Sequence, residues 1–300
     1  MKDYLNKINN EYPIRRTKKQ KDEFINYVKN EFEIVNVDQI NQHKNIIIGN
    51  FDNAKIILTA HYDTPAKSLF PNLVIPRCFI LNLIYQLFFI GIFFGISCLA
   101  SFILKYMFNL TYEVWYFLFL SMYFVLFFIA TMTFTNKHNF NDNTSGVATV
   151  LEIIKTTQKN DICVVLFDNE EKGLLGSKAF NKKYKNIVDE KLIINFDCVG
   201  NGNNVLVACK KEAMNNQYLA LLKECVVSNN KYNVMYFDSK KIFGSTDYKN
   251  FKQSISFMAY NKNKVIGYYT SRIHTSKDTV VDSENIKFLT DNIIKVFEKI

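Results

Sequence analysis

Two adjacent glutamates, Glu170 and Glu171, are the first residues of this sequence that suggest chemistry. They follow an uninterrupted apolar run at residues 162–167, which predicts a buried strand, and they precede a glycine-containing helical stretch. Neighbouring side chains on an extended strand end point in opposite directions, so one carboxylate can bind a metal while the other faces a substrate or a water. The ordinary alternative for two glutamates considered alone is an acidic turn in contact with solvent.

The sequence holds further residues of the types that bind metals. His61, Asp142, Glu171, Asp197 and His274 offer two imidazoles and three carboxylates, which suit zinc or another first-row divalent metal. Five ligands are too many for one tetrahedral zinc with an open position, and they suit two metals with one bridging carboxylate. Taken one at a time, each residue has an ordinary alternative, such as a loop histidine or, for Asp142, a helix cap.

The elements that must position these residues follow from the apolar periodicity. Strands are predicted at residues 32–37, 45–49, 55–59, 162–167, 192–196, 204–208 and 254–259. Helices are predicted at residues 18–32, 147–155, 174–184, 211–227 and 283–299. Strands that alternate with helices indicate an α/β fold with a mixed, mostly parallel central sheet covered by helices on both faces. In such sheets, sites form outside the carboxyl ends of the strands, where His61, Glu171 and Asp197 would lie.

Two long uncharged apolar stretches, residues 78–104 and 114–135, interrupt this pattern. Each is long enough to cross a hydrocarbon core of roughly 30 Å at about 1.5 Å per residue. The connection at residues 105–113 is short, so the two spans would form a hairpin with both outer ends on the same side of the membrane. A buried hairpin in a soluble core is the alternative. The predicted organisation is one catalytic domain, residues 1–75 and 136–300, with a transmembrane hairpin inserted at residues 76–135.

The basic residues predict the orientation of this hairpin. Lys67 and Arg77 precede the first stretch, Lys137 follows the second, and the first 70 residues carry many more lysines and arginines. By the positive-inside rule, both soluble parts face the cytoplasm. Residues 1–21 are polar and basic and do not resemble a signal peptide. We therefore expect a two-span protein of the cell membrane with a cytoplasmic catalytic domain.

The composition narrows the range of partners. The formal net charge is +9, but the lysines are dispersed, without a basic stripe or an aromatic RNA-binding motif. A solvated surface near anionic lipid therefore explains the charge better than nucleic-acid binding does. The 6 cysteines lack CxxC spacing, which favours reduced thiols in an intracellular protein. The sequence leaves the oligomeric state open.

Five motifs, in the same order along the chain, resemble those of the di-zinc aminopeptidases of metallopeptidase family 28. They are His61-x-Asp63, Asp142-Asn-x-Ser-Gly146, Phe167-x-x-Glu170-Glu171-x-Gly173-Leu-x-Gly176-Ser177, Asn195-x-Asp197-x-x-Gly200 and Ile273-His274-Thr275-x-x-Asp278-Thr279. The resemblance covers nearly all of the sequence outside the hairpin, and it implies that the predicted sheet is that of a zinc aminopeptidase acting on peptides.

The resemblance also implies a ligand set for two zinc ions, although other divalent metals fit the same residue types. His61 and Asp197 would bind one ion, Glu171 and His274 the other, and Asp142 would bridge them.

Two further roles follow from the same resemblance. Asp63 would orient His61, as residues next to a metal-bound imidazole commonly do. Glu170 would be the general base that activates a metal-held water for attack on the peptide bond.

The sequence departs from the family pattern in two places. The hairpin fills the connection between His61 and Asp142, which is short in the family, so both hairpin ends should enter close to the metal site. A membrane-attached or hydrophobic peptide is then a natural substrate. Residues 243–248 resemble the substrate loop of the family, with Tyr248 in place of histidine, and Asp247 is assigned a substrate-binding role.

Two alternative functions remain open from the sequence. Glutaminyl cyclases resemble this family but use one zinc, and a filled set of five ligand positions favours hydrolysis over that aminoacyl transfer. A non-catalytic membrane scaffold on the same fold would bind no metal. Covalent catalysis is not expected, because no serine or cysteine lies in a nucleophile-elbow context.

Overall fold

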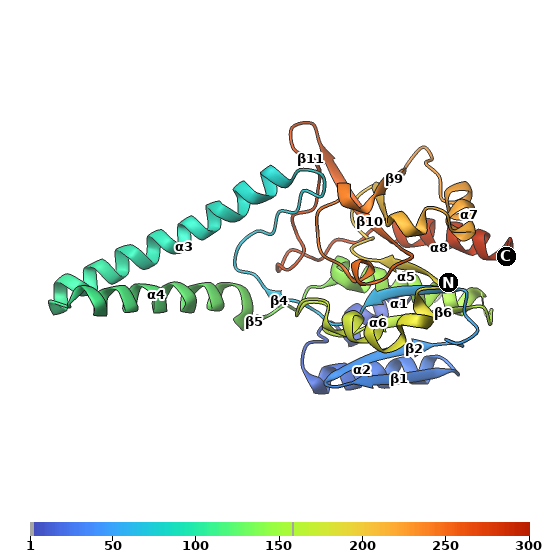
Figure 1. The fold of residues 1–300 in the computed structure, drawn as a ribbon, viewed down its shortest axis with the longest axis horizontal. Helices are drawn as coiled ribbons and strands as arrows, with labels where there is room; N and C mark the ends of the chain where they lie inside the picture. The colour runs from blue at the N-terminus through green and yellow to red at the C-terminus, as the bar shows by residue number, and fades with distance from the viewer. Residues whose placement is uncertain (1–2, 158) are drawn as a thin grey trace.

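The computed structural model describes residues 3–157 and 159–300, and its main body is a mixed sheet between layers of helices (Figure 1). The strands of this sheet are β1 (Val35–Ile40), β2 (His43–Ile48), β3 (Ile56–His61), β6 (Ile162–Phe167), β7 (Leu192–Phe196), β8 (Asn204–Cys209), β9 (Asn233–Asp238), β10 (Ser254–Asn263) and β11 (Gly267–Tyr269). Among the described residues their order is β1-β2-β6-β3-β7-β10-β8-β9, and β11 pairs with β10.

The centre of the sheet is parallel and its margins are mixed. β6, β3, β7 and β10 run parallel to one another, whereas β2 joins β6 and β8 joins β10 in antiparallel pairs. The central strands are buried along their whole length, which explains why they read as continuous apolar runs. The predicted mixed, mostly parallel sheet is thus confirmed.

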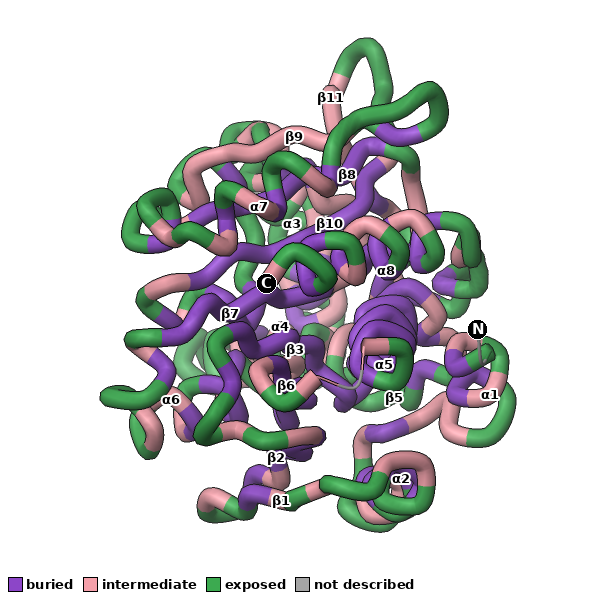
Figure 2. Tube along the Cα trace, turned by 90° about the vertical axis from the view of Figure 1, so that its right-hand side faces the viewer, coloured by how far each residue is buried: buried purple, intermediate pink, exposed green. Residues whose placement is uncertain are grey.

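Helices cover both faces of the sheet. The helices of the domain are α1 (Tyr4–Glu11), α2 (Lys18–Glu31), α5 (Gly146–Thr157), α6 (Leu175–Val188), α7 (Gln217–Cys225) and α8 (Ser283–Glu298). Leu58 and Val164 point into the core that contains α5 and α8, whereas their neighbours Ile57 and Val165 pack with Phe180 of α6 on the other face. Figure 2 shows the buried strands and α5 at the centre of the molecule.

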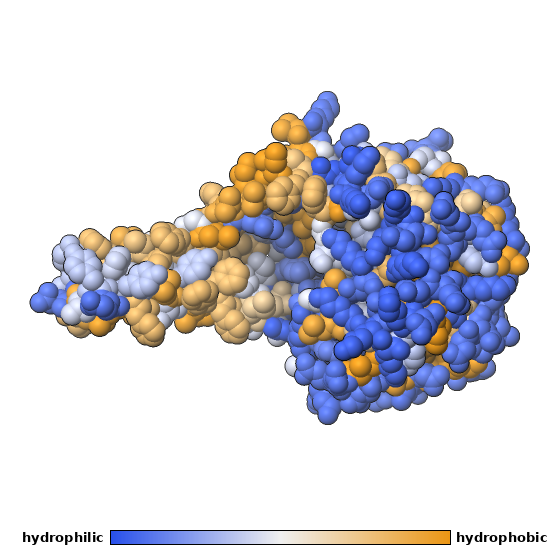
Figure 3. All heavy atoms as spheres, in the orientation of Figure 1, coloured by the Kyte–Doolittle hydropathy of each residue, from blue (hydrophilic) through white to orange (hydrophobic). Residues whose placement is uncertain are grey.

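The inserted segment forms two long helices that project from one side of the domain and come together at its far tip (Figure 1). They are α3 (Phe79–Phe108) and α4 (Tyr112–Phe128), and α4 continues as the short segment η1 (Ile129–Thr133). Among the described residues, these are the two helices long and apolar enough to cross a membrane. Over their most apolar stretches 17% and 11% of the residues are buried, so neither helix lies in the core of the domain. Figure 3 shows this apolar surface projecting from a hydrophilic domain.

The base of the hairpin is held together by a small sheet. β4 (Ala66–Lys67) pairs antiparallel with β5 (Phe134–Thr135), so the chain enters and leaves the hairpin at one place. Arg16 reinforces this base by donating hydrogen bonds to the carbonyl oxygens of Met132 and Phe134 at 2.5 and 3.3 Å.

Several elements differ from the sequence predictions. The helix predicted at residues 211–227 is interrupted, because the Asn216 side chain accepts a hydrogen bond from the Tyr218 amide and starts α7 there. The first apolar helix extends to Phe108, and the end of the second predicted span lies in η1 and β5. α1, β9 and β11 were not predicted, since each is short and partly polar.

Candidate active site

Three neighbouring parallel strands deliver the first site residues to one edge of the sheet. His61 is the last residue of β3, Glu170 and Glu171 follow β6, and Asp197 directly follows β7. Because these strands run parallel, their carboxyl ends meet at the same edge, as the sequence analysis expects.

The remaining two residues reach this edge from loops. Asp142 lies in the short segment η2 (Phe140–Ser145), which leads into α5, and His274 lies in the loop after β11. The Asn143 side chain connects η2 to β7: its amide nitrogen donates to the Phe196 carbonyl oxygen at 2.9 Å, and its oxygen accepts from the Cys198 amide at 3.2 Å. Gly146 makes this approach possible, because a Cβ atom there would clash with the Phe196 carbonyl oxygen.

The five predicted metal-binding side chains form two groups that share Asp142. His61 Nε2 lies 3.2 Å from Asp142 Oδ1 and 3.8 Å from Asp197 Oδ1. His274 Nε2 lies 3.0 Å from Asp142 Oδ2 and 3.5 Å from Glu171 Oε2. Within each group the candidate ligand atoms lie within 4.8 Å of one another. The structure therefore brings all five residues together, with one Asp142 oxygen facing each histidine.

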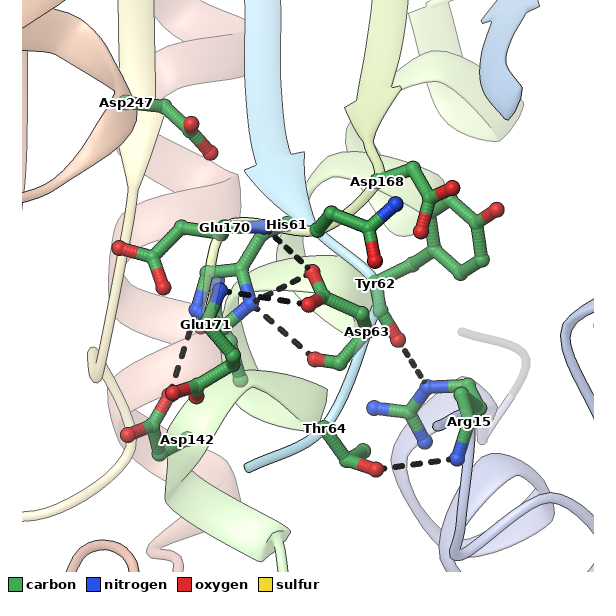
Figure 4. Close-up of polar contacts among 12 residues, drawn as sticks. Arg15, His61, Tyr62, Asp63, Thr64, Asp142, Asp168, Glu170, Glu171 and Asp247 are labelled. Carbon is green, nitrogen blue, oxygen red and sulfur yellow. Dashed lines mark hydrogen bonds and ion pairs between the residues drawn. The ribbon is translucent and has the colours of Figure 1, made fainter. Parts of the chain in front are cut away.

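Asp63 connects His61 to the glutamate turn. The Asp63 carbonyl oxygen lies 3.1 Å from His61 Nδ1, while its carboxylate oxygen is farther from that nitrogen, at 3.7 Å. The Asp63 carboxylate accepts hydrogen bonds from the amides of Glu170 and Glu171 at 3.0 and 3.3 Å (Figure 4). Asp63 thus contacts the imidazole mainly through its main chain, and its side chain positions both glutamates.

The site concentrates negative charge away from water. Burial and the nearby Asp142 together raise the pKa of the Glu171 carboxyl to about 8, against the opposing charge of His274. Burial also raises the pKa of Glu170 well above its ordinary value, and the neighbouring Glu171 adds to this effect. Within the part of the chain that the structure describes, the buried Glu171 Oε1 has no hydrogen-bond partner.

These observations fit a divalent cation site. Two imidazoles and three carboxylates, one of which has an unpartnered oxygen, are suitable metal ligands, and bound cations would favour the ionised carboxylates that burial otherwise disfavours. The three groups of candidate ligands found among the described residues all belong to this one cluster.

Asp278 supports the cluster from behind. Its two carboxylate oxygens accept hydrogen bonds from the amides of Asn141 and Asp142, each at 3.0 Å. Burial raises the pKa of Asp278 to about 7, and the charge of Asp142 acts in the same direction. Asp278 belongs to the His274 motif, but the sequence analysis gave it no role of its own.

Arg15 is a supporting residue that the sequence analysis missed. Its side chain is fully buried and donates to the carbonyl oxygens of Tyr62 and Tyr12, at 2.5 and 2.7 Å, and to the Thr144 hydroxyl at 3.1 Å. Its amide also donates to the Thr64 hydroxyl at 3.0 Å (Figure 4). Burial lowers the pKa of the guanidinium to about 10, so it stays charged at neutral pH. One arginine therefore ties the His61 loop to η2.

Asp247, the predicted substrate-binding residue, lies behind the pocket surface. It is 1% exposed, its Oδ1 accepts a hydrogen bond from the Ser177 hydroxyl at 2.5 Å, and it is not among the described residues that line the site pocket. Figure 4 places it at the edge of the cluster. Its neighbours Thr246 and Tyr248 line the pocket instead.

The pocket over the ligand cluster is small and mostly apolar beyond the charged residues. Its volume is about 220 Å³, below the 300–1,000 Å³ or so typical of small-molecule sites. Apart from the ligand cluster, its lining is largely apolar and includes Val74, Ile242, Phe243, Tyr248, Met258, Tyr260 and Ile273.

Solved structures share this fold. The chain is similar to a Zn-dependent exopeptidase from Parabacteroides distasonis (TM-score 0.58, 16% identity, 98% of this chain and 94% of that chain covered). It is also similar to Porphyromonas gingivalis glutaminyl cyclase (TM-score 0.58, 14% identity, 99% and 96% covered). A third similar structure is the Legionella pneumophila LapA aminopeptidase (TM-score 0.57, 14% identity, 98% and 69% covered). At these identities the similarity shows the fold.

Sequence comparison supplies the family. No curated protein sequence matches the chain. The model of Peptidase family M28 matches residues 132–296, which is more than half of the chain and includes Asp142, Asp197 and His274. The chain therefore belongs to Peptidase family M28.

Proposed function

We propose that the protein is a membrane-anchored, zinc-dependent peptidase of the aminopeptidase type, which removes N-terminal residues from peptides. The observation that carries this proposal is the pair of ligand groups that share Asp142. Membership of Peptidase family M28 supports a peptidase, and the solved zinc-dependent exopeptidase of the same fold supports the choice of metal and reaction.

The ligand cluster would hold two zinc ions. His61, Asp142 and Asp197 would bind one ion, and Asp142, Glu171 and His274 the other. Bound zinc supplies Lewis acidity, which polarises a peptide carbonyl and makes a water more acidic.

The position of Glu170 supports a role in proton transfer. A Glu170 oxygen lies within 4.8 Å of candidate ligand atoms of His61 and Glu171, and the residue lines the pocket. We propose that it takes a proton from the attacking water as the water oxygen bonds to the peptide carbon. It then gives this proton to the leaving nitrogen as the C–N bond breaks. Burial raises the pKa of Glu170, which makes its carboxylate a stronger base and so favours the first of these two proton transfers.

The size of the pocket favours removal of one residue at a time. A volume of about 220 Å³ accommodates one side chain, and apolar lining residues such as Ile242, Met258 and Ile273 favour an apolar one. We therefore expect leucyl amides to be cleaved faster than lysyl amides, as measured by kcat/KM.

The hairpin would anchor this enzyme to the cell membrane. The exposed apolar surface of α3 and α4 needs an apolar environment, and the basic residues at its base favour a cytoplasmic catalytic domain. We propose one catalytic domain of residues 1–75 and 136–300 with the hairpin at residues 76–135. The pairing of β3 with β6 and β7 across the insertion supports this division. We expect residues 105–113 to be open to protease, and a cysteine introduced there to be open to a thiol probe, from outside the cell but not from the cytoplasm.

Metal content and amide hydrolysis test the enzymatic proposal. Detergent-purified protein should carry two zinc equivalents and hydrolyse leucyl amide. Glu170→Gln should keep both equivalents but lose roughly 10²–10⁴-fold in kcat. Glu171→Gln is the matched variant, and it should lose zinc because it removes a ligand. Two bound zinc ions with no hydrolysis of any aminoacyl amide would contradict the proposal.

Cyclisation of N-terminal glutamine is the second candidate, because the fold extends over nearly the whole Porphyromonas gingivalis glutaminyl cyclase. It predicts one zinc equivalent and the release of ammonia from a glutaminyl peptide without cleavage of a peptide bond. Mass spectrometry of a glutaminyl peptide after incubation distinguishes the two reactions. A protein that binds no metal and shows neither reaction would instead be a membrane scaffold.

A further inference from the structure

A second cavity lies between the base of the hairpin and the catalytic domain. Its volume is about 680 Å³, three times that of the site pocket. Its walls are the chain entering the hairpin, one side of α3, two residues at the end of α4 and η1, and the loop at Phe243. The lining residues from the helices are Phe79, Asn82, Leu83, Tyr85, Gln86, Phe89, Ile90 and Phe93 of α3, with Phe127 and Thr131.

The cavity adjoins the candidate active site. Four residues line both hollows, namely Asn72, Val74, Phe243 and Gly244. The space beside Gly244 is open, since a Cβ atom there would have no other atom within 4 Å. The pocket at His61 and His274 and the larger cavity therefore adjoin each other at Gly244.

Main-chain hydrogen bonds hold the wall that the two hollows share. The Phe243 amide donates to the Pro76 carbonyl oxygen at 2.7 Å. Val74 and Thr270 exchange two main-chain hydrogen bonds, at 2.8 and 3.0 Å. The chain entering the hairpin is thus fixed to loops that line the metal pocket, and the two hollows keep a constant relation to each other.

The larger cavity offers apolar surface. Phenylalanine and aliphatic side chains make up most of its lining. The Asn82 side chain accepts a hydrogen bond from the Ile75 amide and donates to the carbonyl oxygens of Ile75 and Cys78. The Tyr85 hydroxyl donates to the Pro71 carbonyl oxygen at 2.5 Å. These polar groups are already engaged within the chain, so what the cavity presents to a ligand is chiefly hydrocarbon.

The cavity also reaches into the apolar length of the hairpin. Its lining runs along α3 from Phe79 to Phe93, and at about 1.5 Å per residue this stretch is roughly 20 Å long. These residues belong to the helix that is apolar enough to cross a membrane. The cavity therefore runs from the metal pocket toward the depth of a bilayer.

We propose that this cavity holds the apolar chain of a membrane-embedded peptide whose scissile bond lies in the metal pocket. This inference rests on the proposed peptidase function, and it names the substrate class as peptides with an apolar segment or acyl group close to the cleaved bond. A lipid of the bilayer is the other possible occupant, but the cavity shares four lining residues with the pocket that Glu170 lines, and only a substrate would occupy both hollows.

Hydrolysis of matched substrates in lipid nanodiscs tests the inference. One substrate is a short leucyl amide, a second carries a pentaleucine tail after the cleaved bond, and a third carries a palmitoyl-lysine there. For the wild type, kcat/KM should be about tenfold or more higher for at least one tailed peptide than for the short leucyl amide, because each buried methylene favours binding. The two tails distinguish apolar side chains from an acyl group as the preferred chain.

A pair of isoleucines on α3 gives matched variants. Ile90 lines the cavity, whereas Ile84 is 57% exposed and is not among the described lining residues. Ile90→Trp should fill the cavity and bring the kcat/KM of the tailed substrate down towards that of the short one. Ile84→Trp should keep the wild-type ratio of the two kcat/KM values. Equal ratios in all three proteins would overturn the inference while leaving the peptidase proposal intact.

A binding experiment separates the inference from catalysis. Zinc-loaded Glu170→Gln protein in nanodiscs is irradiated with a tailed peptide that carries a diazirine on its apolar chain. Mass spectrometry should map the label to residues 79–93 or 127–131, and excess unlabelled tailed peptide should remove it. Labelling of the same residues by a diazirine phospholipid that the peptide does not displace would assign the cavity to lipid and overturn the inference. Absence of hydrolysis of every amide by the wild type would refute the peptidase, and the cross-link would still decide the occupant.

Discussion

The amide of Ser68, at the start of the hairpin segment, donates a hydrogen bond of 2.7 Å to the carbonyl oxygen of His274. The next amide, that of Leu69, donates to the Ala130 carbonyl oxygen in η1 at 3.0 Å. Consecutive residues therefore bind the metal-site loop on one side and the returning end of the hairpin on the other. A displacement of the hairpin base would be passed directly to a candidate metal ligand.

Ser68→Pro should weaken the His274 side of the site. Proline lacks the amide hydrogen, so the 2.7 Å bond is lost, and one such bond contributes about 1 kcal/mol, or roughly fivefold in an equilibrium constant. We expect a roughly fivefold rise in the zinc dissociation constant, measured by competition with a chelator. Ser68→Ala keeps the amide and is the control. Equal zinc affinity in the two variants would show that this bond does not position His274.

Asp278→Asn should loosen Asp142. An asparagine can accept a hydrogen bond from one of the two amides, of Asn141 and Asp142, but it turns its own NH2 group toward the other. Loss of such support typically costs 10–100-fold in metal affinity, so about that rise in the zinc dissociation constant is expected. Asp291→Asn, on the exposed side of α8, should leave the affinity unchanged. Wild-type affinity in Asp278→Asn would contradict the supporting role.

Arg15→Lys should destabilise the domain although it keeps the charge. Lysine cannot reach the two carbonyl oxygens and the hydroxyl that the guanidinium binds, and each buried acceptor left without a donor costs about 1–3 kcal/mol. We expect a loss of about 2 kcal/mol or more in the free energy of unfolding, seen as a lowered Tm in detergent. The neighbouring Arg16→Lys is the matched control, because Arg16 is more exposed. An equal, small change in both variants would refute this account.

The buried cysteines should resist alkylation in the folded protein. Burial raises the pKa of Cys163 and of Cys209 to about 12, so at pH 8 almost none of either thiol is ionised, and the thiolate is the reactive form. Maleimide labelling at pH 8 should be at least 100-fold slower at both than after unfolding in urea. Because the unfolded thiols ionise near pH 8.5, these groups also disfavour the folded state as pH rises above that value and up to about 12. Rapid labelling of folded Cys163 would contradict its burial.

The sequence predicted best those elements whose pattern is determined locally. β6 and β7 match the predicted residues 162–167 and 192–196, because a strand buried on both faces must be apolar at every position. The five candidate ligand residues could be selected for a related reason, since few residue types bind metals and each of these follows a strand or opens a helix or loop. The distances between these residues could not be predicted, because they depend on the order of the strands in the sheet.

The features that sequence reasoning missed depend on distant partners. Arg15 is buried because Tyr62 and Thr144 accept its hydrogen bonds, and nothing in the neighbouring residues indicates this. The Asp247 carboxylate accepts a hydrogen bond from Ser177 on α6, a contact that its motif does not indicate, and its role toward a substrate stays a prediction. The large cavity exists because α3 and Phe243 approach each other from separate parts of the chain.

The place of the hairpin in the sheet has a consequence for the order of synthesis. β1, β2 and β3 leave the ribosome before the hairpin, yet β3 pairs with β6 and β7, which leave it afterwards. Likewise, His61 is made before the two apolar helices, and Asp142, Glu171, Asp197 and His274 are made after them. With the hairpin as a membrane anchor, β3 must wait without its neighbours in the sheet while two spans are inserted and the chain returns to the same side. The metal cluster can then form only in a molecule whose two spans are both inserted correctly. With one span misplaced, His61 and the other candidate ligands would lie on opposite sides of the bilayer.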